Sequence, residues 1–484
     1  MEESLSKKWK KKDAEDLCDR LGHKRRLVWD VLNAREKKRV SGLCEKYKKF
    51  LDTGKTEREV VSRLVERAGR SGFKPLEDSR ALAVGAVAYS VVGDKCIALA
   101  RIGKLPVDSG VSLIAAHIDS PRLDFKHNPL YENTDLAFFK THYYGGIRKH
   151  QWFARPLALH GRVVLADGKG VDIVVGEDDG DPVFTILDLL PHLAGRVQNN
   201  KRLAEAFVAE KMNVLAGSLP LGPEKVKDRF KLAVLHMLHE KYGMVEQDLL
   251  SAEIEIVPAG PARDVGFDRA LVGGYGQDDR VSAFCAVEAL FSAHKDGPPE
   301  KTCVAFLFDK EEVGSDGKTG ARTNLVEDLV GDLLHATDQQ ASQRNVRKAL
   351  ARTRAISADV SPGLDPDYQD VHEKNNAAKL GYGVCLTKYT GSRGKVGSSD
   401  ASAEYLGEIR RVFNESDIVW QTGTLGKVDA GGGGTIAKFL AFYGMDVVDC
   451  GVPVLSMHSP FEVAHKADIL MCHRAYRAFF ERMG

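Results

Sequence analysis

The stretch CVAFLFDKEEVG, residues 303–314, begins as an apolar strand and ends in a glycine turn, with two adjacent glutamates where the strand stops. A second stretch, SGVSLIAAHIDSP at residues 109–121, is a continuous apolar run of the kind found in a sheet that is covered on both faces. Such strands alternate with helical segments, among them residues 278–297 and 465–483. This alternation predicts an α/β fold, a three-layer domain with a mostly parallel core sheet.

The order of segments indicates that a second domain interrupts the first. The chain begins with highly charged segments of helical periodicity, followed by two β-branched runs around a glycine turn that predict a hairpin. From about residue 126 to 263 the pattern changes to short strands with glycine turns, and helical stretches follow at 189–207 and 222–243. We therefore predict an inserted, β-rich domain over residues 126–263, within an α/β domain formed by residues 1–125 and 264–484.

Composition limits the classes of protein that the sequence fits. Its 484 residues are too many for one ordinary core, and 43% hydrophobic with 28% charged residues is typical of soluble globular proteins. The net charge of +1 gives no overall field for nucleic acid, and no apolar run approaches the ~20 residues of a membrane span. Eight isolated cysteines and an N-terminus without an apolar core predict a cytoplasmic protein with reduced thiols. The basic KKWKKK at residues 7–12 is interpreted as the solvated face of an N-terminal helix.

Acidic or histidine residues follow apolar strands at several places, each beside glycine, proline or serine. In open α/β sheets the ligand crevice lies at the carboxyl ends of the strands, so these side chains are expected to converge there. The residues are His117, Asp119, Asp278, Asp279, Glu311, Glu312, Asp359 and His458.

Two histidines with several carboxylates are a ligand set that suits zinc, or cobalt or manganese in its place. The carboxylates outnumber the ligands that one zinc needs, which favours two metals that share a bridging carboxylate. A metal pair about 3.5–4 Å apart can activate a water and polarise a carbonyl at the same time. The sequence therefore predicts a hydrolytic two-metal site assembled by the whole domain.

The adjacent glutamates have different expected roles. Neighbouring side chains of an extended chain point to opposite sides, so Glu312 can bind a metal while Glu311 faces the reacting water as a general base. Asp119, two residues after His117, is placed to orient that ligand from behind. Taken singly, each residue also fits a surface charge, a buried core histidine, a helix cap or a turn. Only their coincidence at strand ends favours a metal site.

The order of five motifs resembles the M18 family of metallo-aminopeptidases, which includes aspartyl aminopeptidase and aminopeptidase I. These motifs are AAHIDSPRLDFK, the DDR that opens a helix, DKEEVGS, SADVSPG and GVPVLSMHSPFEV. The resemblance runs from about residue 75 to the C-terminus and implies a two-zinc exopeptidase that removes N-terminal residues from peptides. It implies that His117 and Asp359 bind one zinc, that Glu312 and His458 bind the other, and that Asp278 bridges the two. It also implies that Glu311 is the general base and that Asp119 is the supporting aspartate. The residue after the bridging aspartate is often asparagine in the family, whereas here it is Asp279.

The resemblance also implies an assembly. The inserted segment corresponds to the family's dimerisation domain, and His192 in LLPHLA corresponds to a histidine that reaches a neighbouring subunit's active site. The family forms tetrahedral particles of twelve subunits with an inner chamber, so the substrates are expected to be short peptides. Lys379 lies where the family has a lysine near the substrate side chain, which leaves acidic specificity open against a broad or leucine-like one. The glycines of VDAGGGG, residues 428–434, either hold substrate main chain or form a tight turn.

Two other functions remain open from the sequence. A related two-zinc carboxypeptidase or deacylase would place a cation for a substrate carboxylate, for which Lys379 and Arg393 are the only candidates. A non-catalytic assembly particle is less consistent, because every group expected for catalysis is present. A scan of aminoacyl substrates with and without chelator distinguishes these functions.

Overall fold

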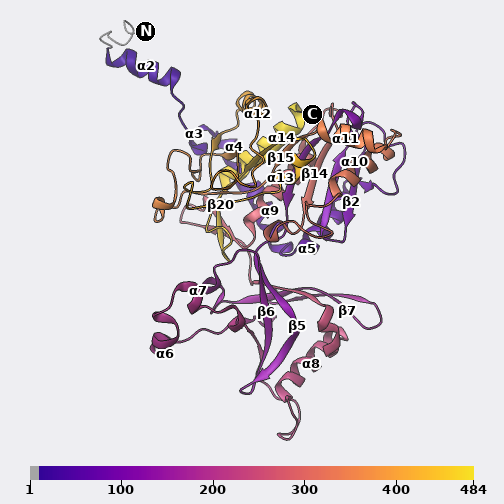
Figure 1. Cartoon of the computed structure of the whole chain (residues 1–484), viewed down its shortest axis with the longest axis vertical. Helices are drawn as coiled ribbons and strands as arrows, with labels where there is room; N and C mark the ends of the chain where they lie inside the picture. Colours follow the sequence, from indigo (N-terminus) through magenta and orange to yellow (C-terminus); the bar gives the residue numbers. More distant parts are fainter. Residues whose placement is uncertain (1–9, 484) are drawn as a thin grey trace.

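The computed structural model describes residues 10–483, and Figure 1 shows two parts, a larger body of sheet and helices and a smaller β-rich part. The first described helix is α2 (Lys11–Leu21), which stands away from the body and buries no residue. The helices α3 (Val28–Val31), α4 (Ala34–Thr53) and α5 (Glu57–Arg70) follow. Capping boxes at Asn33 and Thr56 start the last two of these helices. The first part of KKWKKK lies outside the described residues.

A nine-stranded mixed sheet forms the centre of the larger body. Its inner strands β14, β4, β15 and β21 run parallel, whereas β2, β3 and β17 pair antiparallel at its flanks, and the predicted hairpin is β2–β3. The order of strands across the sheet is β1 (Lys74–Pro75), β2 (Val87–Val92), β3 (Cys96–Arg101), β14 (Cys303–Phe308), β4 (Ser112–His117), β15 (Arg354–Ser357), β21 (Asp446–Gly451), β17 (Val384–Thr387) and β19 (Trp420–Thr422).

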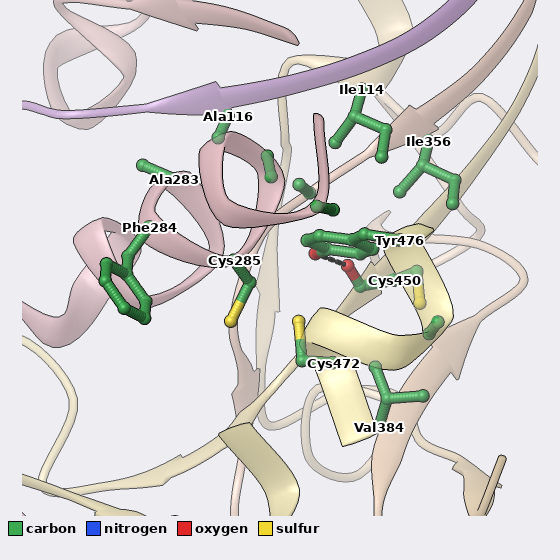
Figure 2. Close-up of a cluster of buried hydrophobic side chains, with 14 of the residues drawn as sticks. Ile114, Ala116, Ala283, Phe284, Cys285, Ile356, Val384, Cys450, Cys472 and Tyr476 are labelled. Carbon is green, nitrogen blue, oxygen red and sulfur yellow. Dashed lines mark hydrogen bonds between the residues drawn. The ribbon is translucent and has the colours of Figure 1, made fainter. Parts of the chain in front are cut away.

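Helices cover both faces of this sheet, because its inner strands are apolar on both sides. Alternate residues of β4 enter different cores: Ile114 lies in one and Leu113 in the other. Figure 2 shows the first core, where Tyr476 packs near Ile114 and donates a 2.5 Å hydrogen bond to the Cys450 carbonyl. The helices that contribute to this core are α3, α4, α5, α9 (Gln277–Ser292), α12 (Ala403–Glu415) and α14 (Lys466–Arg482). Those that contribute to the other are α10 (Leu325–Ala336), α11 (Gln343–Ala351) and α13 (Ala437–Phe442). The prediction of a layered α/β fold is confirmed.

The β-rich part is a seven-stranded antiparallel sheet with its own core around Trp152. The sheet begins at Arg122, so the predicted boundary at residue 126 falls inside its strand β5. In order across the sheet, the strands are β8 (Gly170–Val175), β7 (Leu157–Val164), β11 (Glu253–Pro258), β5 (Arg122–Asn133), β6 (Leu136–Tyr144), β10 (Val214–Gly217) and β9 (Thr185–Ile186).

Two helical predictions for this part need correction. The stretch 189–207 is not one helix but α6 (Pro191–Ala194), a single π turn (Gly195–Asn199) and α7 (Leu203–Ala206). Gly195 stays in the right-handed helical conformation, and the break between the π turn and α7 begins at Asn200, a residue type that favours helix poorly. The helix predicted from residue 222 begins only at Arg229, as α8 (Arg229–Tyr242), after Asp228 in the left-handed conformation.

A third, five-stranded sheet links the segments that carry the candidate site. It consists of β12 (Arg263–Val265), β13 (Leu271–Gly274), β23 (Glu462–His465), β22 (Pro453–Leu455) and β16 (Ser361–Pro362). A two-stranded ribbon, β18 (Gly391–Ser392) with β20 (Gly432–Gly433), lies nearby. Within residues 10–483, no helix combines the length and the apolar character needed to cross a bilayer.

Candidate metal centre

The parallel strands bring three of the predicted side chains to one edge of the sheet. His117 is the last residue of β4, and its neighbour in register on β14 is Phe308, three residues before Glu311. On the other side β15 ends at Ser357, two residues before Asp359. Asp278 follows β13 at the start of α9, and His458 lies in the turn between β22 and β23. The carboxyl ends of the strands thus gather the cluster, as predicted.

Asp278 lies between the two histidines. Its Oδ1 is 3.3 Å from Nε2 of His117 and its Oδ2 is 3.2 Å from Nε2 of His458. Nε2 of His458 is also 3.4 Å from Oε2 of Glu312, and Nε2 of His117 is 4.0 Å from Oδ1 of Asp359. His117, Asp278 and Asp359 offer ligand atoms within 4.8 Å of one another, and so do Asp278, Glu312 and His458. These two groups share Asp278, and a third group combines His117 with Glu311 and Glu312.

Asp279 does not join either group, although it follows Asp278 directly. Its side chain is fully buried and neither carboxylate oxygen has a hydrogen-bond partner. Burial raises the pKa of Asp279 well above its usual value. Of the two aspartates, Asp278 therefore has the position of a shared ligand.

Each histidine is held from behind so that Nε2 faces the cluster. Nδ1 of His117 lies 3.1 Å from both the main-chain oxygen and Oδ1 of Asp119, and Nδ1 of His458 lies 3.0 Å from the carbonyl of Gly146. These partners only accept, so each Nδ1 carries a proton and Nε2 is the ring nitrogen left for a metal ion to take up in place of its proton. This is the tautomer that a metal ligand requires.

Asp119 also holds the turn that carries the two glutamates. Its Oδ1 accepts the N–H of Glu311 at 3.1 Å, and its Oδ2 accepts the N–H of Glu312 at 3.2 Å and the hydroxyl of Tyr144 at 2.7 Å. The expectation of an extended chain here is wrong: Lys310 adopts φ 67° and the glutamates open a 3₁₀ turn. Neighbouring side chains still diverge, because a 3₁₀ turn has about three residues per turn.

Glu462 supports two segments of the cluster, and the sequence did not predict it. Its Oε1 accepts the N–H of His458 at 2.8 Å and its Oε2 accepts the N–H of Asp278 at 3.1 Å, so one carboxylate ties two ligand segments together. The side chain is 1% exposed. Its only sequence signal is its place four residues after His458 in a quoted motif.

The electrostatics of the cluster fit a bound cation. Burial, with the charges of Asp119 and Asp278, raises the pKa of Glu311 to about 7. Burial also raises the pKa of Glu312 and of Asp359 well above the usual carboxyl value. Oε1 of Glu312 is buried without a hydrogen-bond partner. Several buried carboxylates gathered around two imidazoles are stabilised by a metal ion, and the imidazole and carboxylate donors are those that zinc prefers.

The cluster opens into a cavity of about 210 Å³. Glycines 432–434 line it, where β20 pairs with β18, and a Cβ on Gly432 would lie 2.5 Å from Cβ of Ser392. The glycine loop is therefore part of the cavity wall, and at Gly432 only glycine fits.

Two predicted substrate contacts do not join the cluster. Lys379 is exposed and lies outside the cavity lining, and its backbone N–H bonds to Gln421. His192 is exposed on α6, in the β-rich part (Figure 1). Within one chain, neither residue lines the cavity at the candidate metal centre.

Comparisons with known proteins identify the family. Residues 50–480 match the family model described as aminopeptidase I zinc metalloprotease (M18). A probable M18 family aminopeptidase 1 from Clostridium acetobutylicum is 47% identical over 456 residues, covering 93% of this chain and 97% of that protein. Its counterpart in Borrelia garinii subsp. bavariensis is 45% identical over 459 residues, covering 95% and 100%. A crystal structure of an M18 aminopeptidase from Thermotoga maritima superposes with a TM-score of 0.91 at 45% identity, covering 95% of this chain and 100% of its own.

These similarities extend over nearly the whole length of both partners, and they confirm the family that the five motifs indicated. They also favour aminopeptidase activity over the carboxypeptidase, deacylase and assembly-particle alternatives. The chain belongs to the M18 family of zinc metalloproteases and is a metallo-aminopeptidase.

Proposed function

We propose that this aminopeptidase works with two cations per chain, one on His117 and Asp359 and the other on Glu312 and His458, with Asp278 shared. The observation that carries the proposal is the position of Asp278, whose two oxygens face Nε2 of the two different histidines at 3.3 and 3.2 Å. Zinc is the cation that the family description names, and cobalt or manganese has compatible ligand preferences.

The chain's own residues supply the proton chemistry. When bound, the cations would polarise the substrate carbonyl and make water a better nucleophile. Glu311 lines the cavity and accepts the proton of the attacking water, then passes it to the leaving amine. Asp119 keeps Glu311 in place through the backbone N–H and keeps His117 in its ligand tautomer. The product is a free amino acid and a shortened peptide.

Removal of the metals tests this function. We expect a chelator such as 1,10-phenanthroline to abolish hydrolysis of leucyl-fluorophore substrates, and added zinc, cobalt or manganese to restore it. The melting temperature should fall on chelation, because a ligand that binds only the folded state stabilises it by about 4 kcal/mol at 1,000 times its Kd. Full activity in the metal-free protein would contradict the proposal, and so would hydrolysis from the C-terminus of peptides.

An apolar surface on the β-rich part suggests the partner. Large hydrophobic side chains are exposed between residues 183 and 208, with Leu193 at 63% exposed. The other members are Val183, Leu187, Leu189, Leu190, Val197, Leu203 and Val208. A concentration of this kind marks an interface, and we propose that a second copy of the chain covers it. A yeast aminopeptidase of similar fold, 20% identical with a TM-score of 0.73, is described as a dodecamer. We propose a tetrahedral dodecamer built from dimers, which admits short peptides.

His192 lies on this apolar surface, beside Leu190 and Leu193, which places it at the proposed dimer contact. We propose that it reaches the partner's cavity and helps to polarise the substrate carbonyl. The variants His192→Ala and Glu311→Gln should each have little activity, but their co-expressed mixture should regain a measurable fraction. In a mixed dimer, an intact Glu311 meets an intact His192 of the other subunit. A mixture no more active than its components would contradict a role across subunits. Adding Leu193→Asp should separate the dimer, as measured by light scattering, and should therefore abolish the recovery of activity.

The cysteines fit the cytoplasm, which we propose as the compartment. All eight are free, and seven of them are buried. Free buried thiols are typical of proteins kept in a reducing environment.

A further inference from the structure

The end of β6 and the turn after it belong to the β-rich part of the chain, yet they lie against the candidate metal centre. Tyr144 is the last residue of this strand, and its hydroxyl donates a 2.7 Å hydrogen bond to Oδ2 of Asp119. Two residues later, the carbonyl of Gly146 lies 3.0 Å from Nδ1 of His458. This segment therefore supports one proposed ligand directly, and it also supports the aspartate that holds another.

Asp119 is fully buried, and each of its carboxylate oxygens receives two hydrogen-bond donors. Oδ1 lies 3.1 Å from Nδ1 of His117 and 3.1 Å from the backbone nitrogen of Glu311. Oδ2 lies 3.2 Å from the backbone nitrogen of Glu312 and 2.7 Å from the Tyr144 hydroxyl. The bond from Tyr144 is the shortest of the four, and hydrogen bonds to a carboxylate are strengthened by its charge. Without Tyr144, Oδ2 would keep only the longest of them.

Arg122 holds the Tyr144 ring in place. The two residues are opposite each other on β5 and β6, and the guanidinium carbon lies 3.9 Å from the ring centroid. Arg122 pairs with Asp124 on its own strand at 2.9 Å and with the buried Glu57, on α5 of the larger body, at 3.2 Å. Burial and the charge of Asp119 raise the pKa of Tyr144, so its hydroxyl keeps the proton that it donates. The position of this hydroxyl thus depends on an ion pair that joins the two parts of the chain.

We propose that Tyr144 is a positioning residue of the aminopeptidase reaction, because its hydroxyl holds Asp119 and thereby the turn that presents Glu311 to the water. The proposal rests on the general-base role proposed above for Glu311. A general base must stay within hydrogen-bond reach of the proton that it takes, and small displacements are costly in rate. Lys310, just before the glutamates, has φ 67°, which is unfavourable for a residue with a side chain. The turn therefore needs contacts from outside to keep its shape.

Tyr144→Phe tests this proposal, because it removes the hydroxyl and keeps the ring beside Arg122. We expect kcat for a leucyl-fluorophore substrate to fall by about 10- to 100-fold, as is usual when a residue that supports a metal site is lost. KM should stay within about twofold and the zinc content should not change, since Tyr144 neither lines the cavity nor contacts a ligand. Tyr143→Phe is the matched control. It makes the same change at the preceding residue, which is 43% exposed, and should leave kcat unchanged.

A double-mutant cycle shows whether Tyr144 acts through Asp119. In an Asp119→Asn protein, Tyr144→Phe should lower kcat by less than about threefold, because residues that act as one unit have non-additive effects. An equal factor in both proteins would overturn the proposal. A loss of kcat that follows lost zinc, or unfolded protein in calorimetry, would assign Tyr144 a purely structural role and would also overturn it.

The same assays separate this inference from the proposed function. Wild-type kcat in Tyr144→Phe, in an enzyme that Glu311→Gln inactivates, would refute only the positioning role. If Glu311→Gln is as active as the wild type, the proposed base is wrong, and the positioning role fails with it.

Discussion

Glu311→Gln is expected to lower kcat by about 10³- to 10⁴-fold, the upper part of the range for loss of a general base. Glutamine has the shape of glutamate but does not take a proton from water. Glu311 lines the cavity, and its position depends on a backbone N–H bond to Asp119 that the substitution leaves intact. The variant should therefore keep its fold and both cations while losing turnover. Stopped assays with a leucyl-fluorophore substrate measure kcat, and elemental analysis measures the metal content.

Glu300→Gln is a suitable control for this variant, because Glu300 forms an ion pair with Lys104 at the surface. It should have wild-type turnover. The base assignment is wrong if Glu311→Gln turns over as fast as the control. If Glu311→Gln is inactive and has also lost metal, the result would identify Glu311 as a metal ligand instead of the base.

Asp278→Asn should have a comparably large effect through a different cause. Since Asp278 lies within reach of both histidines, its loss weakens both proposed cation sites at once. The asparagine amide has no negative charge to bind a cation. In a buried cluster, water does not take the place of the lost carboxylate. We expect the variant to retain well under half of the wild-type metal after dialysis and to lose activity by at least about 10³-fold, since metal ions contribute several kcal/mol to such reactions.

Asp279→Asn is the matched control, since it makes the same chemical change at the next residue. Asp279 belongs to neither ligand group, and neither of its oxygens is hydrogen bonded. This variant should keep its cations, and it has the residue that the family often has at this position. Loss of metal from Asp279→Asn, with retention in Asp278→Asn, would exchange the roles of the two aspartates.

The sequence predicted the cluster because its members end apolar strands. A parallel sheet places the carboxyl ends of neighbouring strands at one edge, so His117 and Asp359 are brought close by topology alone. The inner strands β4 and β14 were also predictable, because strands buried on both faces appear in the sequence as continuous apolar runs. The prediction that Glu311 and Glu312 have different roles had the wrong geometric basis, because their backbone is a turn.

Residues that support the ligands through long-range contacts could not be found this way. Tyr144 belongs to β6 of the β-rich part, yet its hydroxyl donates to Asp119. The guanidinium carbon of Arg122 lies 3.9 Å from the centroid of the Tyr144 ring. Arg122 in turn forms an ion pair with the buried Glu57. No spacing in the sequence relates these positions. The helical prediction for 189–207 is confirmed in pieces but not as one helix, because the chain leaves the helical conformation after Asn199.

Anomalous diffraction at the zinc absorption edge, on crystals of the zinc-loaded protein, tests the central claim most directly. Two peaks of similar height about 3.5–4 Å apart are expected, with Asp278 between them. One should lie within bonding distance of His117 and Asp359, and the other of Glu312 and His458. A single peak, or zinc bound away from these side chains, would contradict the account.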